Sequence, residues 1–169
     1  MSEHDNLLTQ QVPRLRRYAR ALTGDRAGAD DLVQDTLERA LSRLHLWRQG
    51  SDLRAWLFTI MHNIFVNQIR SRARRQHEAL ENEPAADALR AADPDWLELR
   101  DLERALARLP DEQRAVMLLV GLEQFTYDEA ARVLGVPIGT VMSRLSRARE
   151  RLRLVLGGDF KAAPLKVIK

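Results

Sequence analysis

Arginine and hydroxyl side chains gather in one stretch near the C-terminal end of the chain. Between positions 137 and 156 the sequence has five arginines, at positions 144, 147, 149, 151 and 153, and one acid, Glu150. A guanidinium can form two hydrogen bonds with O6 and N7 of guanine, and the backbone amides at the start of a helix can bind phosphate. These residue types predict a helix that reads DNA through a face made of Gly139, Thr140, Ser143, Arg144, Ser146 and Arg147. A basic amphipathic helix that docks on a partner protein is the alternative.

A helix-turn-helix would position these side chains. Thr126 followed by Glu129 matches a capping box at the start of a first helix. Gly135 can adopt the positive φ of a tight turn, and Pro137 fits the first turn of a second helix. In the second helix the spacing predicts a buried stripe made of Val141, Leu145, Ala148 and Leu152. The DNA-reading side chains lie off this stripe, so we expect them to face away from the core.

The rest of the chain also has helical periodicity, and no stretch alternates convincingly with period two. We expect one helix to start near Pro13 and to stop at Gly24, and a helix capped by Ser51 or Asp52 to follow from position 53. Between them, residues 29–44 place seven side chains on one side: Leu32, Val33, Thr36, Leu37, Ala40, Leu41 and Leu44. Further helices are expected over 96–109 and from Asp111. The sequence therefore predicts an all-α fold.

An acidic segment divides the chain. Between positions 78 and 103 there are nine acids and two arginines, whereas four arginines lie just before it, at positions 70, 72, 74 and 75. Residues 78–95 have few large apolar side chains to offset the entropy lost on ordering. We expect two small helical domains, residues 1–77 and 96–156, joined by a flexible acidic linker at 78–95 and followed by a tail at 157–169. The uneven charge indicates a polyanionic partner.

The sequence lacks the residues that several functional classes require. The chain has no cysteine, which excludes disulfides and thiolate zinc sites. It has no Ser-His-Asp set, P-loop or Gly-rich fingerprint, and its four histidines show no metal-ligand spacing. The N-terminus lacks the pattern of a signal peptide, and no apolar run is long enough to span a bilayer. We therefore expect a cytoplasmic protein with no enzyme activity, cofactor, metal site or membrane span.

Three blocks of sequence resemble the extracytoplasmic-function (ECF) sigma factors, the minimal two-domain class of the sigma-70 family of bacterial RNA polymerase subunits. "DLVQDTLERAL" resembles region 2.2, "AWLFTIMHNIFVNQIR" resembles regions 2.3 to 2.4, and residues 106–152 resemble region 4. The resemblance covers residues 13–152 in the family's order and extends to the general-stress branch. It implies a protein that binds core RNA polymerase and directs it to the −10 and −35 promoter elements, and that is itself controlled by an anti-sigma factor.

The resemblance also implies where these partners bind. Region 2.2 docks on the β′ subunit of the polymerase, and the matching polar face consists of Asp31, Gln34, Asp35, Glu38 and Arg39. Plain solvation of this face is the alternative. The resemblance also implies the β subunit of core polymerase as a partner, and an acidic linker that threads between the two lobes.

Region 2 of the family opens the −10 element and binds a base flipped out of the strand, which needs planar surfaces and hydrogen-bonding groups. The matching loop supplies Trp47, Arg48, Gln49 and Ser51, although Trp47 could instead be a core residue. Along the next helix the spacing i, i+4, i+7 places Asn63, Asn67 and Arg70 on one face. Region 4 reads the −35 element, which again selects Thr140, Ser143, Arg144 and Arg147. Met142 stands where many relatives have lysine, so one phosphate contact of the family is missing.

Two other functions remain open at the level of sequence. A sigma mimic would bind an anti-sigma factor without reading DNA, but mimics of the general-stress branch carry a receiver domain, and no βα repeats are present to build one. A conventional helix-turn-helix regulator would dimerise on a palindrome and would not need the separate N-terminal lobe. The sequence also leaves open whether the two lobes stay apart or pack together.

Overall fold

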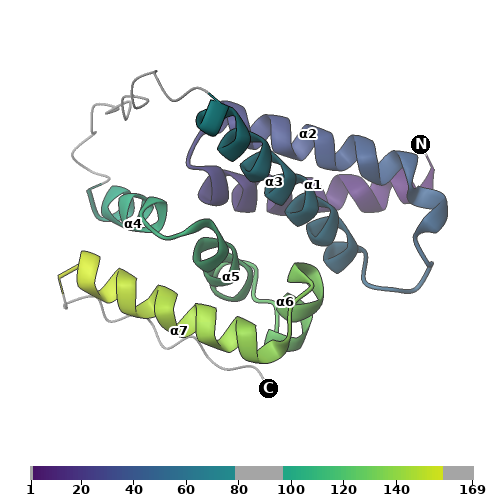
Figure 1. Ribbon diagram of the computed structural model, residues 1–169. Helices are drawn as coiled ribbons and strands as arrows, with labels where there is room; N and C mark the ends of the chain where they lie inside the picture. The colour runs from purple at the N-terminus through teal and green to yellow at the C-terminus, as the bar shows by residue number, and fades with distance from the viewer. Residues whose placement is uncertain (1, 79–96, 158–169) are drawn as a thin grey trace.

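The computed structural model describes residues 2–78 and 97–157, and every regular element within these ranges is a helix (Figure 1). The elements are α1 (Glu3–Thr23), α2 (Arg26–Ser42), the short 3-10 helix η1 (Leu44–Leu46), α3 (Leu53–Glu78), α4 (Leu97–Ala107), α5 (Asp111–Gly121), α6 (Tyr127–Leu134) and α7 (Ile138–Val155). The predicted all-α fold is confirmed. Only residue 78 of the predicted linker (78–95) and residue 157 of the predicted tail (157–169) belong to the described residues.

Helices α1, α2 and α3 form the N-terminal lobe, in which α2 packs on both of the others. Helix α1 begins ten residues before Pro13, because Ser2 and Asp5 form a capping box that starts it earlier; the expected start near Pro13 is therefore wrong. Gly24 ends α1 at φ 67°, as expected. Asp52 caps α3 by accepting a hydrogen bond from the amide of Ala55 at 3.2 Å.

The predicted buried face of α2 is confirmed except at its edge. Leu32, Val33, Thr36 and Ala40 are buried, but Leu41 is 52% exposed. At 100° per residue Leu41 lies about 120° around the helix from the centre of the buried stripe, which is too far to reach the core. Leu41 is therefore a surface residue rather than a core residue.

Helices α4 to α7 form the C-terminal lobe, whose helix-turn-helix is α6 and α7. The capping box is present, with Thr126 and Glu129 exchanging hydrogen bonds of 3.1 and 3.2 Å. Gly135 makes the turn at φ 67°. All four residues of the predicted stripe of α7 are buried. The local signals in the sequence thus predicted this motif correctly.

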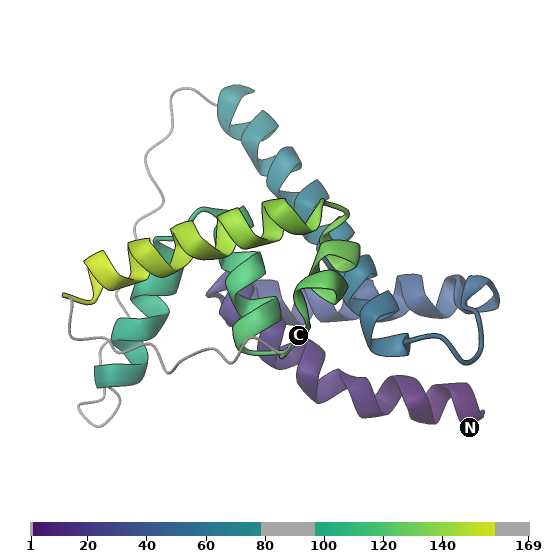
Figure 2. The ribbon, with the colours of Figure 1, turned by 90° about the horizontal axis from the view of Figure 1, so that it is seen from below.

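The two lobes pack against each other. Helix α3 contacts α6, and α1 contacts both α4 and α5. Helix α7 lies below the N-terminal lobe in Figure 1 and toward the viewer in Figure 2. Buried side chains of both lobes form one continuous hydrophobic cluster. The inter-lobe interface is therefore part of the core, and the arrangement is a closed one.

One guanidinium supports the ends of two helices at this interface. Arg114 on α5 donates to the carbonyl oxygens of Leu106, Ala107 and Leu109 at the end of α4, at 2.7–3.1 Å. It also donates to the carbonyl oxygen of Leu22 in the last turn of α1, at 3.0 Å. Carbonyls at a helix end lack partners within the helix, so Arg114 satisfies such groups in both lobes at once.

Candidate polymerase and promoter interfaces

The polar face of α2 is open to solvent over its whole length. The five side chains predicted to dock on the polymerase are all exposed: Asp31, Gln34, Asp35, Glu38 and Arg39. Gln34 donates to Glu38 at 3.3 Å, one helical turn further on. The opposite face of α2 is buried against α1 and α3, which holds the helix in place and leaves its polar face free to meet a partner.

The loop before α3 is a tight turn that brings its four candidate residues together. The amide of Ser51 donates to the carbonyl of Arg48 at 3.0 Å. Trp47 is half-buried, packs edge-on against the His4 ring with centroids 6.1 Å apart, and has a buried Nε1 without a hydrogen-bond partner among the described residues. Gln49 contacts His4 at 2.9 Å. Trp47 is thus neither a fully buried core residue nor a fully exposed surface for a flipped base, because one part of its ring is packed and another is accessible.

The amide face of α3 is exposed as predicted. Asn63, Asn67 and Arg70 all point into solvent, while Met61, Ile64 and Phe65 on neighbouring faces are buried. At 1.5 Å per residue, Arg70 lies about 26 Å along the helix from Leu53. The loop and the helix face therefore form an extended track, which suits a single strand better than a compact ligand.

The face of α7 that is predicted to read DNA is exposed only in part. Ser143 and Arg147 are exposed, but Thr140 and Arg144 are half-buried. Arg144 Nη2 lies 3.6 Å from Glu112 Oε2 on α5, and the side chain is 21% exposed. The expectation that all four side chains face away from the core is wrong for these two. At 100° per residue Arg144 lies only about 70° around the helix from the centre of the buried stripe, on the edge that meets α5 of the same lobe.

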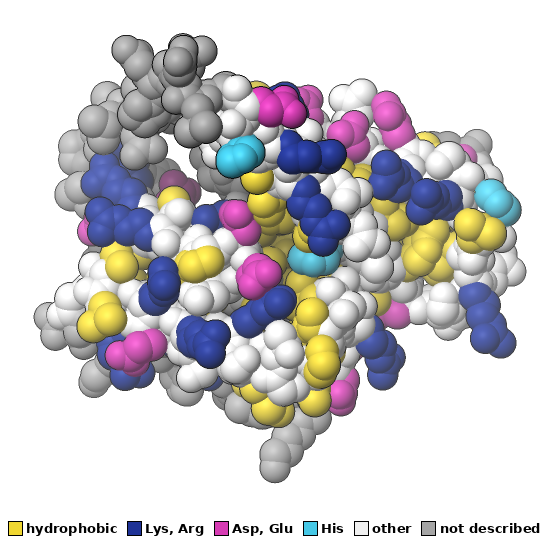
Figure 3. Space-filling view, viewed as in Figure 1, with side chains coloured by type: hydrophobic (Ala, Val, Ile, Leu, Met, Phe, Trp, Pro, Cys, Tyr) yellow, Lys and Arg dark blue, Asp and Glu magenta, His cyan; other side chains and the backbone are white. Residues whose placement is uncertain are grey.

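His62 on α3 shows how close the two lobes are. Burial is the main cause that lowers the pKa of His62 from 6.5 to about 4, and the positive charge of Arg144 lowers it further, while Glu112 opposes the shift. The imidazole is therefore neutral at pH 7. In Figure 3 apolar side chains and a histidine line the boundary between the lobes, with arginine side chains on both sides.

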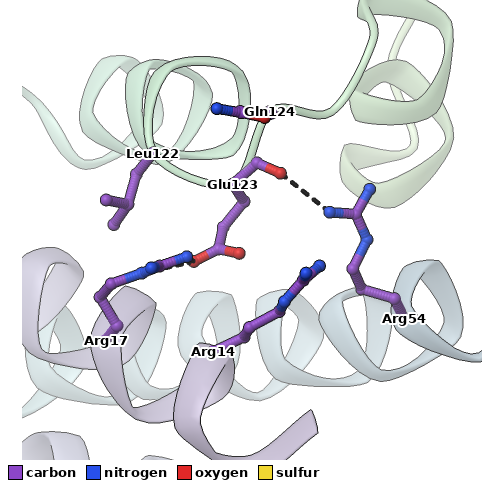
Figure 4. A pocket seen from close by; sticks show the side chains of 6 residues that line it. All are labelled: Arg14, Arg17, Arg54, Leu122, Glu123 and Gln124. Atoms are coloured by element: carbon purple, nitrogen blue, oxygen red, sulfur yellow. Dashed lines mark hydrogen bonds and ion pairs between the residues drawn. The ribbon is translucent and has the colours of Figure 1, made fainter.

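No pattern in the sequence predicts the polar contacts that cross the interface between the lobes. Glu123, in the loop between α5 and α6, is buried with 3% of its surface exposed. It meets Arg17 from α1 and Arg54 from α3, while Arg14 lines the same cavity (Figure 4). Each of these residues has an ordinary position in a solvated helix or loop when read alone. Only the packing of the lobes brings them together.

The described residues offer no helix long and apolar enough to cross a membrane. In the same two ranges, no group of three or more histidine or acidic side chains is arranged to hold a metal ion.

Comparison with known families finds a match for each of the two lobes. Residues 8–62 match the family model described as the sigma2 domain of PhyR, and residues 99–152 match sigma-70 region 4. The two matches fall on the N-terminal and C-terminal lobes in the predicted order. A conventional helix-turn-helix regulator would lack the first of them.

Whole-chain relatives are ECF sigma factors. The chain is 40% identical over 165 residues to the ECF RNA polymerase sigma factor EcfG of Rhodopseudomonas palustris, covering 94% of this chain and 87% of the relative. It is 36% identical to SigM of Mycobacterium tuberculosis, covering 90% and 76%. It is 30% identical to the RNA polymerase sigma factor YlaC of Bacillus subtilis, covering 88% and 89%.

Solved structures match the chain over most of its length. The sigma factor RpoE of Bartonella quintana, in complex with the anti-sigma factor NepR, matches with a TM-score of 0.82 and 38% identity over 94% of this chain and 99% of that chain. CnrH in complex with the cytosolic domain of CnrY matches with a TM-score of 0.66 and 28% identity, over 92% of this chain and 88% of that chain. The PhyRSL–NepR complex from Sphingomonas sp. Fr1 matches with a TM-score of 0.62 and 25% identity, over 91% of this chain and 88% of that chain. The identity to sigma factors exceeds that to PhyR, which favours a sigma factor over a mimic.

The family matches of the two lobes define a sigma-70-type transcription initiation factor, a polymerase subunit that recognises promoters and carries out no catalysis itself. Within that class, the chain belongs to the ECF RNA polymerase sigma factors. It therefore acts with RNA polymerase and promoter DNA.

Proposed function

We propose that each exposed face described above has one partner in transcription initiation. The α2 face (Asp31, Gln34, Asp35, Glu38 and Arg39) binds β′, and the loop at Trp47, Arg48, Gln49 and Ser51 with Asn63, Asn67 and Arg70 of α3 binds the −10 strand. Thr140, Ser143, Arg144 and Arg147 of α7 read the −35 element. The β subunit lies along both lobes. The observation that carries this proposal is the joint exposure of the α2 face and the α3 track on one rigid lobe.

The closed arrangement also indicates how the chain is controlled. The sigma factor RpoE of Bartonella quintana is held by NepR in an arrangement that matches this chain over 94% of its length. We infer that this chain is likewise bound by an anti-sigma factor, in the cytoplasm where the polymerase works, and that it serves a general stress response like the EcfG group to which it is similar. The domain limits of 1–77 and 96–156 are the units that we propose to bind these partners.

Run-off transcription with purified core polymerase and a small promoter library tests the proposal. We expect transcripts from a subset of promoters that share −10 and −35 sequences, and addition of the anti-sigma factor encoded by the same organism should abolish them. Failure to produce any promoter-dependent transcript, with polymerase activity intact on a control sigma factor, would contradict the proposal.

A further inference from the structure

Three arginines of the N-terminal lobe line a cavity at the loop between α5 and α6 (Figure 4). Arg14 and Arg17 lie one turn apart on α1 and therefore on the same face of that helix, and Arg54 reaches the cavity from the first turn of α3. The cavity has a volume of about 370 Å³, and its lining consists of Arg14, Arg17, Arg54, Leu122, Glu123 and Gln124. None of these residues belongs to the faces proposed above to bind polymerase or promoter DNA.

The lining of this cavity carries an excess of positive charge. Three guanidiniums stand against one carboxylate, that of Glu123, and Glu129 lies 3.8 Å from Arg54 at the edge of the group. Arg14 is exposed and has no ion pair or hydrogen bond among the described residues. Guanidiniums that converge in this way bind oxyanions well, because each one donates several hydrogen bonds from a fixed fork. The cavity is therefore suited to an anion that carries more than one oxygen.

Glu123 narrows the choice of anion. Its side chain is 1% exposed, and its Oε1 accepts hydrogen bonds from Nε and Nη2 of Arg17 at 3.3 and 3.1 Å. Its Oε2 is buried without a hydrogen-bond partner among the described residues. In Figure 4 the carboxylate lies between Arg17 on one side and Arg14 on the other. A buried acceptor without a donor costs free energy, so a ligand that brings a donor to Oε2 is favoured.

A ligand that fits this arrangement must accept hydrogen bonds from arginines and also donate one to a carboxylate. Hydrogen phosphate does both, because its deprotonated oxygens accept and its P–OH group donates. A phosphate monoester does the same when one of its oxygens is protonated, which part of the population is near neutral pH, since the second pKa of such esters is about 6. Sulfate has the same shape but carries no proton at neutral pH. It would place an oxygen lone pair against Glu123 Oε2, so the site disfavours it.

We propose that Arg14, Arg17, Arg54 and Glu123 form a binding site for a small phosphate-bearing ligand, either the free ion or a phosphate monoester. Arg14 and Arg54 bind the charged oxygens, Arg17 holds the carboxylate of Glu123 in place, and Glu123 Oε2 accepts a hydrogen bond from the protonated oxygen. Because Arg14 is exposed, its side chain can move to let the ligand reach Oε2. A ligand that binds the folded chain and not the unfolded one stabilises the fold by mass action.

Thermal unfolding of the full chain with added anions tests the site. Inorganic phosphate, glycerol 3-phosphate and sodium sulfate are titrated at pH 7 and at constant ionic strength, because screening alone changes protein stability. We expect at least one of the two phosphates to raise the melting temperature with an affinity about tenfold or more above that of sulfate, since the two anions differ by one hydrogen bond to a charged group. The phosphate that binds more tightly distinguishes the free ion from an ester. Equal affinities for sulfate and both phosphates, or no shift with any of them, would overturn the site.

Glu123→Gln separates the preference for phosphate from the binding of an anion as such. Glutamine keeps the shape, and its side-chain amide can donate to any oxyanion, so sulfate and phosphate should bind this variant with similar affinity. A preference for phosphate that is retained in Glu123→Gln would overturn the role of Glu123.

Arg14→Gln tests the site at an exposed side chain, so it decides the result even if Glu123→Gln does not fold. It should weaken phosphate binding about tenfold, because it removes a charged donor of hydrogen bonds. Arg16→Gln is the matched control, because it makes the same change at an exposed position of α1 outside the cavity, and it should bind phosphate like the parent chain. Unchanged phosphate binding by Arg14→Gln, or an equal loss in Arg16→Gln, would contradict the proposed site.

Discussion

The guanidinium of Arg54 lies 4.0 Å from the centroid of the Phe125 ring, which joins the first turn of α3 to the loop that precedes α6. The same side chain donates to the carbonyl of Glu123 and lies 3.8 Å from the carboxylate of Glu129. Only 20% of the Arg54 side chain is exposed. A partly desolvated contact of this kind is stronger than one in water. Unfolding of one lobe is therefore expected to destabilise the other.

Arg54→Gln should weaken this coupling. The variant loses the stacking on Phe125 and a charged hydrogen bond, which together contribute about 1–3 kcal/mol. In urea unfolding followed by helicity, the midpoint should fall, and the two lobes should unfold over a broader transition. Arg153→Gln is the control, because its 63% exposed side chain makes a surface ion pair that contributes less than about 1 kcal/mol. Equal midpoints for the two variants would contradict the assigned role of Arg54.

Arg144→Ala should weaken −35 recognition at one base position. A bidentate contact to guanine contributes about 1–3 kcal/mol of discrimination, so competition binding with a set of single-base variants of the −35 duplex should show a loss confined to one position. Arg151→Ala, further along α7 and exposed, should lower affinity equally for every sequence or leave it unchanged. An equal loss across all sequences for Arg144→Ala would show a phosphate contact and not a base contact.

Asp35→Arg should reduce binding to core polymerase while both lobes remain folded. Asp35 is exposed in the middle of the α2 face, so reversing its charge places a repulsive group at the proposed β′ contact without disturbing the core. Pull-down of core polymerase measures the loss, and circular dichroism checks the fold. Asp101→Arg, the same change at an exposed position of α4, is the control. Retention of polymerase by Asp35→Arg at the level of the control would remove the β′ assignment.

The closed form should lose stability in mild acid through His62. Its pKa is lowered from 6.5 to about 4 by burial and by Arg144, so the unfolded chain binds more protons than the folded chain between these values. The contribution of His62 is therefore complete above pH 6.5 and is lost as the pH falls toward 4, with an upper limit of about 3 kcal/mol. Unfolding free energies measured at several pH values should show this loss in the parent chain.

His62→Gln should flatten part of that pH dependence, since glutamine does not titrate in this range. His45→Gln is the matched control, because His45 is exposed on η1. A pH profile that is the same in His62→Gln and in the parent chain would assign the acid sensitivity to other groups.

Local features of this protein were determined by the sequence alone. The spacing of Val141, Leu145, Ala148 and Leu152 predicted the buried side of α7, and Thr126 with Glu129 predicted the start of α6. These features could be predicted because each depends on neighbours within a few residues, where helix geometry fixes the distances. The exposed faces of α2 and α3 follow from the same periodicity. The start of α1 differs from the expected one, because the capping box of Ser2 and Asp5 begins the helix well before Pro13.

The tertiary structure alone decided how the lobes meet. The hydrogen bonds of Glu123 to Arg17 and to Arg54 join residues 106 and 69 positions apart, and no local pattern marks these residues as partners. The half-burial of Arg144 was likewise decided by tertiary structure, because its partner Glu112 lies on α5, and the spacing within α7 gives no information about which helix packs beside it. Helical spacing specifies one helix at a time, whereas contacts between lobes depend on the surfaces that complete domains present to each other.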